Sequence, residues 1–292
     1  MDKTNSHIVP DLYKMLCSQT VGVPPEEEAE IIENMANNMK QIMKETFSQV
    51  RDTRKVRLSS VGKPDRRLWH EYHNPKKVEA SLDGPTRMRF LYGHFTEEMV
   101  LALVKLTGHA VTDEQKVVQV AGVTGHMDCK INGIVVDVKS ASAYGFRKFK
   151  NNTLHLDDPY GYIGQNKSYA HAEGDKKYGW LAFDKANGEL AYLEYDETLG
   201  GTAYADAVDY DIVQRVKDVK KLLGFDASPE ALCSEPVNDG KTANMKLAVG
   251  CTYCPFKADC FPGLRTFLYA GGPKYLTTVV TLPRVAELTD EF

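Results

Sequence analysis

Long apolar runs are missing from this sequence of 292 residues. No stretch reaches the roughly eighteen consecutive apolar residues that a membrane-spanning helix needs, and the first seven residues have no apolar signal core. Internal repeats are absent, and only six cysteines occur. These absences argue against membrane-spanning, repeat and secreted disulfide-rich proteins. We therefore expect a cytoplasmic protein without a membrane partner, and its 42% hydrophobic content is ample for a buried core.

An excess of positive charge is also missing, because the net charge is −4 at pH 7. The charges are unevenly distributed, however: residues 25–36 are acidic, whereas residues 51–77 carry nine basic side chains against three acidic ones. A second basic cluster follows at residues 147–150. Phosphate contacts need local cations rather than a basic protein overall, although a solvated charged face would look the same. We expect DNA phosphates to be contacted by Arg66, Arg67, Arg147, Lys148 and Lys150.

Two acids and a lysine come together in a predicted β-hairpin. Side chains two positions apart on a strand share a face, so Asp137 and Lys139 project together while the valines between and before them enter the core. The dipeptide Asn132-Gly133 ahead of them is a strong hairpin signal. The preceding strand carries Asp128, with His126 on the same face. The hairpin thus predicts one surface that holds both acids and the lysine.

Two carboxylates beside an ammonium group suit a bound divalent cation, because hard cations prefer carboxylate oxygens. The lysine would then orient an attacking water or stabilise negative charge that develops on a phosphate. An exposed strand face that carries a simple ion pair would give the same pattern. The residues on either side of the hairpin favour the metal site.

Two helices flank the hairpin in the sequence. The apolar residues of 97–107 recur at helical spacing, and Glu97 falls near the predicted start, where an acid is also favoured by the helix dipole. Downstream, Gln165 and Tyr169 are four residues apart on another predicted helix and share a face. Taken singly, these residues would be a first-turn acid, a surface amide and a half-buried aromatic ring.

Together the four motifs read Gly-x-x-x-Glu, Gly-His-x-Asp, Asp-x-Lys and Gln-x-x-x-Tyr. This order resembles the RecB-like branch of the PD-(D/E)XK nuclease superfamily, which includes phage recombination exonucleases and CRISPR-associated adaptation nucleases. The resemblance covers roughly residues 60 to 265. It implies one or two Mg²⁺ or Mn²⁺ ions at Asp128, Asp137 and Glu97, with His126 as a ligand or close neighbour. It also implies that Lys139 is catalytic and that Gln165 and Tyr169 orient this lysine or contact DNA.

The resemblance further implies a metal-dependent DNA exonuclease that leaves a 5′-phosphate, in phage-type recombination, repair or DNA degradation. One alternative is an endonuclease or adaptation-type nuclease with the same site. Another is a non-catalytic DNA-binding or recombination partner protein, which the intact pair of acids disfavours. The implied partner is DNA, with a recombinase or a single-strand-binding protein as a possible protein partner. If the protein is phage-encoded, it would act in the host cytoplasm.

A second motif combines three cysteines, Cys251, Cys254 and Cys260. It resembles the C-terminal part of the [4Fe–4S] staple in some RecB-like nucleases. In those proteins a fourth cysteine precedes an Arg-rich Leu-Trp helix, but the corresponding stretch 63–69 contains none. We expect Cys233, or less readily Cys17, to complete a structural site for [4Fe–4S] or Zn²⁺, which four thiolates suit about equally.

The predicted fold class is α/β: a restriction-endonuclease-like core, with a mixed central sheet flanked by helices. We expect a helical N-terminal region at 1–60, the nuclease core at 61–225 and a Cys-cluster segment at 226–292 packing on the core. The predicted elements comprise helices at 25–48, 66–72, 97–107, 165–172 and 207–223, strands at 116–121, 124–131, 134–140, 179–184 and 190–195, and irregular segments at 74–86 and 144–158.

Overall fold

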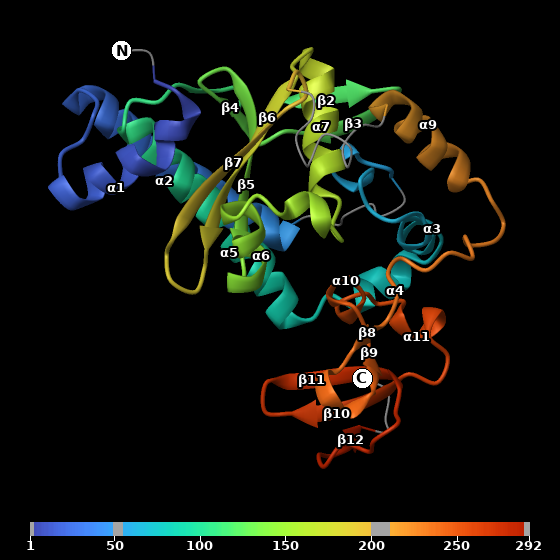
Figure 1. Ribbon diagram of the computed structural model, residues 1–292. Coiled ribbons are helices and arrows are strands. Elements are labelled where there is room, and N and C mark those ends of the chain that lie inside the picture. The colour runs from blue at the N-terminus through green and yellow to red at the C-terminus, as the bar shows by residue number, and fades with distance from the viewer. Residues whose placement is uncertain (1–2, 49–54, 200–210, 289–292) are drawn as a thin grey trace. The chain divides into compact units, whose positions relative to one another are not determined.

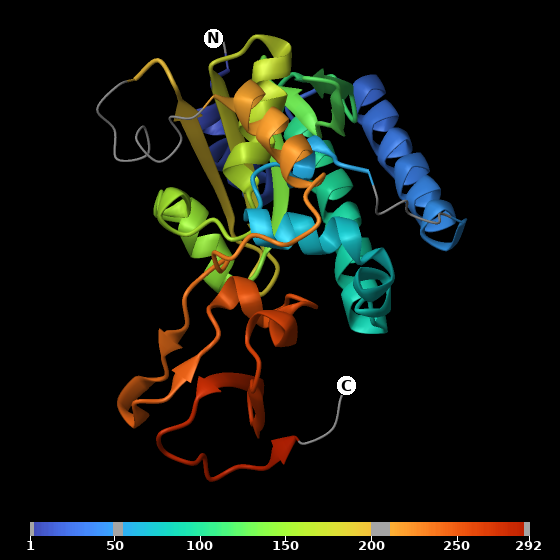
Figure 2. The same ribbon diagram turned by 90° about the vertical axis from the view of Figure 1, so that its right-hand side faces the viewer.

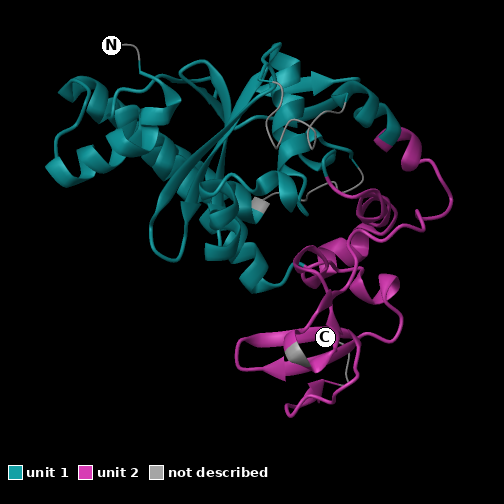
Figure 3. Ribbon diagram, in the orientation of Figure 1, with its two compact units in different colours: residues 1–62, 82–218 teal, residues 63–81, 219–292 magenta. Residues whose placement is uncertain are grey.

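The computed structural model describes residues 3–48, 55–199 and 211–288 (Figure 1). The chain divides into two compact units (Figure 3). Unit 1 combines residues 1–62 and 82–218, and unit 2 combines residues 63–81 and 219–292. The division at residues 60 and 225 that we expected from the sequence stays a prediction.

A mixed five-stranded sheet forms the centre of unit 1, as the sequence predicts (Figure 1). Its strand order is β1-β4-β5-β6-β7, in which only β5 and β6 pair in parallel. The turn between β4 and β5 is the predicted hairpin, because Asn132 and Gly133 both have positive φ angles, of 49° and 84°. The strand bounds are β1 Val111–Thr112, β4 Cys129–Ile131, β5 Ile134–Ala141, β6 Lys177–Asp184 and β7 Leu190–Asp196.

Helices cover both faces of this sheet. On one face α1 and α5 bury apolar side chains against Val136 and Val138 of β5. On the other face α6, α7 and α9 pack around Val135 and Trp180. The helix bounds are α1 Ile8–Ser18, α2 Pro25–Ser48, α5 Gly84–Leu106, α6 Ala143–Lys150, α7 Tyr162–Glu173 and α9 Ile212–Leu222. The side view in Figure 2 shows α2 as a long helix beside α5, against which it packs. None of the described helices combines the length and apolarity needed to cross a bilayer.

Three predicted elements of unit 1 differ in the structure. The predicted strand 124–131 is broken, because β3 (Val123–His126) pairs with β2 (Val117–Val120) in a separate hairpin before β4 begins. The helix that carries Glu97 starts thirteen residues earlier, where Asp83 accepts a hydrogen bond from the Thr86 amide at 2.8 Å and caps it. The segment predicted as irregular contains α6, which buries Phe146 and Phe149. Residues 207–210 of the last predicted helix lie outside the described residues.

In unit 2 the helix predicted at 66–72 is present as α3, whereas α4 lies in the segment predicted as irregular and the antiparallel sheet was not predicted. The sheet order is β12-β10-β11-β9-β8, and three of these strands span only two residues, which is too short to show an alternating pattern. The bounds are α3 Asp65–His73, α4 Pro75–Ala80, β8 Val237–Asn238, β9 Met245–Lys246, α10 Val249–Thr252, α11 Lys257–Cys260, β10 Arg265–Tyr269, β11 Gly272–Thr278 and β12 Glu287–Leu288.

Candidate active site

Asp137 and Lys139 lie on β5, on the side of the sheet that α7 covers. The Asp137 side chain is only 1% exposed, and its Oδ1 accepts hydrogen bonds from Lys139 Nζ at 2.8 Å and Gln165 Nε2 at 3.0 Å. Oδ2 lies 2.6 Å from the same Nζ but accepts no hydrogen bond of good geometry among the described residues. Asp137 therefore retains acceptor capacity in a buried position, which ordinarily calls for a partner.

Asp128 reaches the same place from the segment between β3 and β4. Cys129 pairs with Val136, so one further step along that register sets Asp128 opposite Asp137. The chain leaves the ladder here, and Asp128 Oδ2 accepts the Val138 amide proton at 2.8 Å. Burial, followed by repulsion from Asp137, raises the pKa of Asp128 to about 7.

Glu97 joins these acids from the middle of α5 rather than from its first turn. Its Oε1 accepts a hydrogen bond from Gln115 Nε2 at 2.7 Å. Burial raises the pKa of Glu97 to about 9, and the carboxylates of Asp128 and Asp137 add to this effect. Burial also raises the pKa of Asp137. Three carboxyl groups from three separate segments thus crowd one largely buried place, where Asp137 disfavours the ionisation of both Asp128 and Glu97.

Lys139 supplies the cation of this cluster. Burial opposes its charged form, but the carboxylates of Asp137 and Asp128 outweigh this effect and raise its pKa. Its Nζ also lies 4.9 Å from the centre of the Tyr162 ring, within cation–π range. The lysine is therefore held protonated and positioned between a carboxylate and an aromatic face.

Gln165 and Tyr169 share one face of α7, as predicted, and both point toward the acids. Gln165 Nε2 lies 3.3 Å from the Tyr169 hydroxyl as well as within hydrogen-bonding distance of Asp137. Tyr169 is only 1% exposed and belongs to the core. This geometry lets Gln165 orient Asp137, while Tyr169 supports Gln165 from the core.

The start of α7 depends on residues whose role the sequence reasoning missed. Both carboxylate oxygens of Asp158 accept backbone amide protons, from Tyr162 at 2.9 Å and from Ile163 at 2.8 Å. Gly161 precedes the helix with a φ of 76°, which favours glycine. The segment Asp158-Pro159-Tyr160-Gly161-Tyr162 thus fixes where α7 begins. In the sequence, an acid followed by a glycine just before the predicted helix could have indicated where α7 begins.

Steric crowding explains why glycine occupies position 125 in the Gly-His-x-Asp motif. A Cβ atom at Gly125 would lie 2.8 Å from Leu58 Cβ and 2.8 Å from Tyr169 Cε1. The close approach of β3 to α7 therefore requires glycine. By contrast, His126 is exposed on β3 opposite Val117, and within the described ranges it makes no hydrogen bond or ion pair with the three acids.

The basic cluster on α6 is mostly neutralised. Lys148 Nζ lies 2.6 Å from Asp157 Oδ2, and Lys150 pairs with Glu189. Arg147 is exposed, and within the described residues it makes no ion pair. One of the three predicted phosphate-binding cations on this helix is therefore available without breaking a salt bridge.

In unit 2 Cys233 joins the three cysteines of the C-terminal motif. Burial raises the pKa of Cys251 to about 11, and repulsion from the Cys233, Cys254 and Cys260 thiolates adds to it. None of the six cysteines, all of which lie in described parts of the chain, forms a disulfide, and Cys17 is exposed on α1 of unit 1. These interactions group the four cysteines of unit 2 and leave Cys17 apart from them.

The two arginines of α3 lie beside this thiol group. Arg66 Nε donates to Cys260 Sγ at 3.2 Å, and its Nη1 donates to the backbone oxygen of Pro229 at 2.7 Å. Arg67 pairs with Glu71 at 2.7 Å. Both guanidinium groups are therefore engaged within unit 2, and contacts from them to DNA phosphates stay a prediction.

Neither cluster is arranged as a completed metal site. Among the described residues, no three His, Cys, Asp or Glu side chains are placed so as to hold a metal ion together. The donor chemistry nevertheless fits a hard divalent cation at the acids, since Asp137 Oδ2 lacks a well-aligned donor in the described chain and the carboxyl groups repel one another. The four thiols likewise fit a thiophilic metal or cluster.

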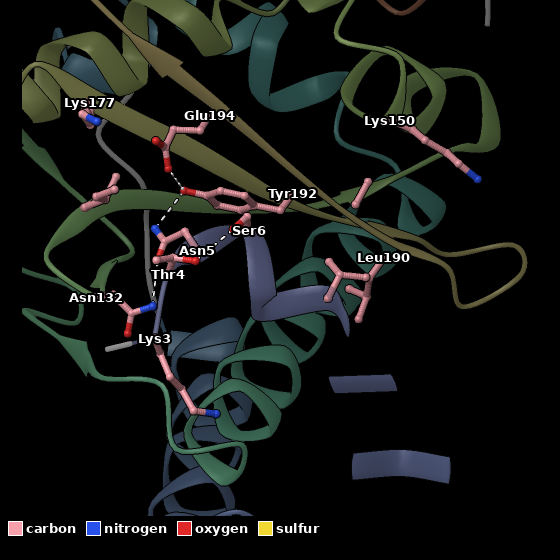
Figure 4. Close-up of a pocket in the computed structure, with 13 residues that line it drawn as sticks. Lys3, Thr4, Asn5, Ser6, Asn132, Lys150, Lys177, Leu190, Tyr192 and Glu194 are labelled. Carbon is pink, nitrogen blue, oxygen red and sulfur yellow. Dashed lines mark hydrogen bonds between the residues drawn. The ribbon is translucent and has the colours of Figure 1, made fainter. Parts of the chain in front are cut away.

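A pocket of about 740 Å³ lies in unit 1 (Figure 4). Its wall includes residues of the N-terminal segment and of β7, and none of the site acids lines it. Asn5 and Asn132 are hydrogen-bonded there at 2.8 Å, and Asn5 also donates to Tyr192 at 2.8 Å. The three lysines of the wall are paired with carboxylates, so we assign this pocket no chemistry.

No family model matches the sequence, and no curated protein does. Among solved structures, the chain is similar to SSO0001, at 17% identity over 78% of this chain and 95% of that one, with a TM-score of 0.44. It is also similar to the alkaline exonuclease LHK-Exo from Laribacter hongkongensis, at 15% identity over 56% and 91%, with a TM-score of 0.34. LHK-Exo in complex with dAMP matches at 13% identity over 57% and 92%, again with a TM-score of 0.34. Likenesses at this level do not decide an activity.

Proposed function

We propose that this protein is a metal-dependent DNA nuclease of the PD-(D/E)XK type, of the RecB-like branch, that acts as an exonuclease. The proposal depends above all on the crowding of Glu97, Asp128 and Asp137 beside Lys139. A protein that only bound DNA would have no use for one buried and two half-buried carboxyl groups at a surface that meets a polyanion. Such crowding costs stability, and groups with strongly shifted pKa values are typical of functional sites.

One or two Mg²⁺ or Mn²⁺ ions would relieve this repulsion. Asp128, Asp137 and Glu97 are the residues that would hold them, and His126 would have to approach from the exposed β3 hairpin. A bound divalent ion lowers the pKa of a water molecule and polarises the scissile phosphate. The acids would then be ionised, because a metal ion competes with their protons.

The remaining residues prepare the site for a phosphate. Lys139 is protonated and held by Asp137 and the Tyr162 ring, so it can stabilise negative charge that develops on the phosphate without first reorganising. Gln165 fixes the rotamer of Asp137 through its amide. Hydrolysis would break the P–O3′ bond and leave a 5′-phosphate on the product.

For unit 2 we propose a structural role, with Cys233, Cys251, Cys254 and Cys260 holding Zn²⁺ or [4Fe–4S]. The helices α10 and α11, which carry Cys251 and Cys260, have only four residues each, so they cannot be stable through their own hydrogen bonds. Arg66 would offset part of the charge of the four thiolates through its contact with Cys260. This assignment concerns stability rather than the cleavage reaction.

Digestion of end-labelled linear DNA tests the enzymatic proposal. We expect nucleotides to be released from the ends of linear DNA in Mg²⁺ or Mn²⁺, with no release in EDTA and none from closed circles. Lys139→Ala should lower the rate by about a hundredfold or more, since a preorganised donor of this kind contributes on that scale. Cleavage of closed circles would favour the endonuclease instead. Binding of DNA without cleavage in either metal would contradict the proposed activity.

A further inference from the structure

We propose that the exposed face of α6 and the loop before α7 form a binding site for unpaired nucleobases, so that the substrate strand enters the active site single-stranded. The reaction that this strand would undergo depends on the proposed function, but of the binding-site residues only Tyr162 also contacts the active-site lysine. Its members are Tyr144, Arg147, Tyr160 and Tyr162.

Two tyrosines of the loop before α7 lie next to each other near the active-site lysine, and a hydrogen bond joins a third tyrosine, on α6, to the same loop. The Tyr162 ring contacts Lys139 on one side and lies 5.6 Å from the Tyr160 ring, with a tilt of 31° between the planes. Tyr144 is 48% exposed, and its hydroxyl donates to Asp157 at 3.2 Å, three residues before Tyr160. Figure 1 shows α6 and the segment that leads into α7 on the same side of the sheet. Tyr144 is therefore the exposed ring of this surface, whereas Tyr160 and Tyr162 are half-buried and Tyr162 contacts Lys139.

The exposed ring of Tyr144 suits a nucleobase. A tyrosine ring left half exposed gains by stacking on another flat apolar surface, and bases stack on such rings with little regard to sequence. Bases in a duplex are already stacked and paired, so only an unpaired strand can use these rings. The occupant is therefore a single strand or a frayed end.

The charges on α6 point in the same direction. Lys148 lies against Asp157 and Lys150 against Glu189, which leaves Arg147 as the cation of this helix that makes no ion pair among the described residues. Lys148 and Arg147 lie 5.0 Å and 6.0 Å from the Tyr144 ring centre, so the unpaired Arg147 can contact a phosphate next to a base at this ring. A duplex-binding face normally needs many phosphate contacts. A single cation of this kind beside three aromatic rings suits a strand held mainly by its bases.

Comparison of two strands tests this directly. One is a twelve-nucleotide single strand, and the other has the same phosphates with abasic sites in place of four consecutive bases. Binding is measured by fluorescence anisotropy in Ca²⁺, so that cleavage is not required for the signal. We expect the intact strand to bind at least tenfold tighter, because each stacked base contributes about 1–3 kcal/mol and about 1.4 kcal/mol is tenfold.

Variants locate the effect on this surface. Tyr144→Leu and Tyr160→Leu should each reduce the preference for the intact strand, whereas Tyr144→Phe and Tyr160→Phe should keep it because they retain the ring. Arg147→Gln should lower the slope of affinity against salt by about 0.7, one phosphate on a single strand. The exposed Lys40 on α2 offers a control, since Lys40→Gln should leave the slope unchanged.

Equal affinity of the wild-type protein for the intact and abasic strands would overturn the inference without any variant. Tighter binding of duplex than of single strand would also overturn it. Base-dependent binding without cleavage in Mg²⁺ would support this site while contradicting the proposed nuclease. Cleavage that ignores the missing bases would do the reverse.

Discussion

The acids of unit 1 and the thiols of unit 2 are both crowded groups of metal-ligand side chains, but they are supported very differently. The acids lie beside a five-stranded sheet that has apolar clusters on both faces. The thiols lie on turns and four-residue helices beside two-residue strands. On the functions proposed above, the difference teaches that ligand crowding would serve chemistry where the scaffold is already stable and would serve folding where it is not.

This contrast follows from what each cluster costs the metal-free protein. The surrounding core keeps Glu97, Asp128 and Asp137 together although they repel one another, so apolar burial offsets the electrostatic cost. In unit 2 few of the described apolar side chains are fully buried, Phe256, Phe267 and Leu276 among them. A metal bound there would supply part of the free energy of folding itself.

The largest loss of nuclease activity should follow substitution of Glu97 on α5, and its neighbour Glu98 provides the control. Glu97→Gln should lower nuclease activity by at least about a hundredfold, because it removes a ligand from the metal site. Glu98 is the matched control, since it accepts a hydrogen bond from Asn38 instead and shares no hydrogen-bond partner with the site acids in the described chain. Glu98→Gln should keep nearly full activity. Equal losses in both variants would show that α5 matters here only for folding.

A smaller effect on activity, but a large one on folding, is expected from the cysteines. Cys251→Ser combined with Cys254→Ser should remove bound zinc or iron and make unit 2 sensitive to proteases, because the short helices lose their common anchor. Metal-dependent cleavage by the protein that remains folded should stay within about threefold of wild type. The exposed Cys17 provides the control, and Cys17→Ser should change neither property. A stable, protease-resistant double variant that keeps its metal would refute the structural role.

The smallest effect should appear in the pH dependence of stability. The pKa values of Glu97 and Asp128 are raised in the folded protein, to about 9 and about 7, so the folded state binds protons more tightly than the unfolded one. Their contribution is therefore present at low pH and is lost as pH rises toward 9. The Tm of metal-free protein should fall across this range, whereas the increase in Tm caused by Mg²⁺ should grow. A Mg²⁺ effect of the same size at pH 6 and pH 8.5 would contradict this linkage.

Much of the site could be predicted from the sequence because its signals are local. The Asn132-Gly133 turn and the alternation at Asp137 and Lys139 depend only on backbone geometry, and both are present in β4 and β5. The four-residue spacing of Gln165 and Tyr169 likewise sets them on one face of α7. Each of these features needs no knowledge of distant parts of the chain.

The parts that could not be predicted depend on tertiary contacts. In the first half of α5, apolar side chains such as Met88 and Phe90 are exposed, so the apolar residues there do not mark one buried face of a helix. The strand expected at 124–131 breaks because β3 turns away to pair with β2, which separates His126 from Asp128. The neutralisation of Lys148 and Lys150 depends on carboxylates farther along the chain, which no local pattern reveals.

The most direct test of the central claim is the rate at which Asp137→Asn cleaves an end-labelled strand in Mn²⁺, measured beside wild type together with the Tm of each protein. This substitution retains the shape of the side chain but removes the charge that a metal needs. The account predicts a rate lower by about a hundredfold or more, with a metal-free protein that still folds, because relief of the repulsion from Asp128 offsets part of the lost pairing with Lys139. Cleavage by Asp137→Asn at the wild-type rate would contradict it.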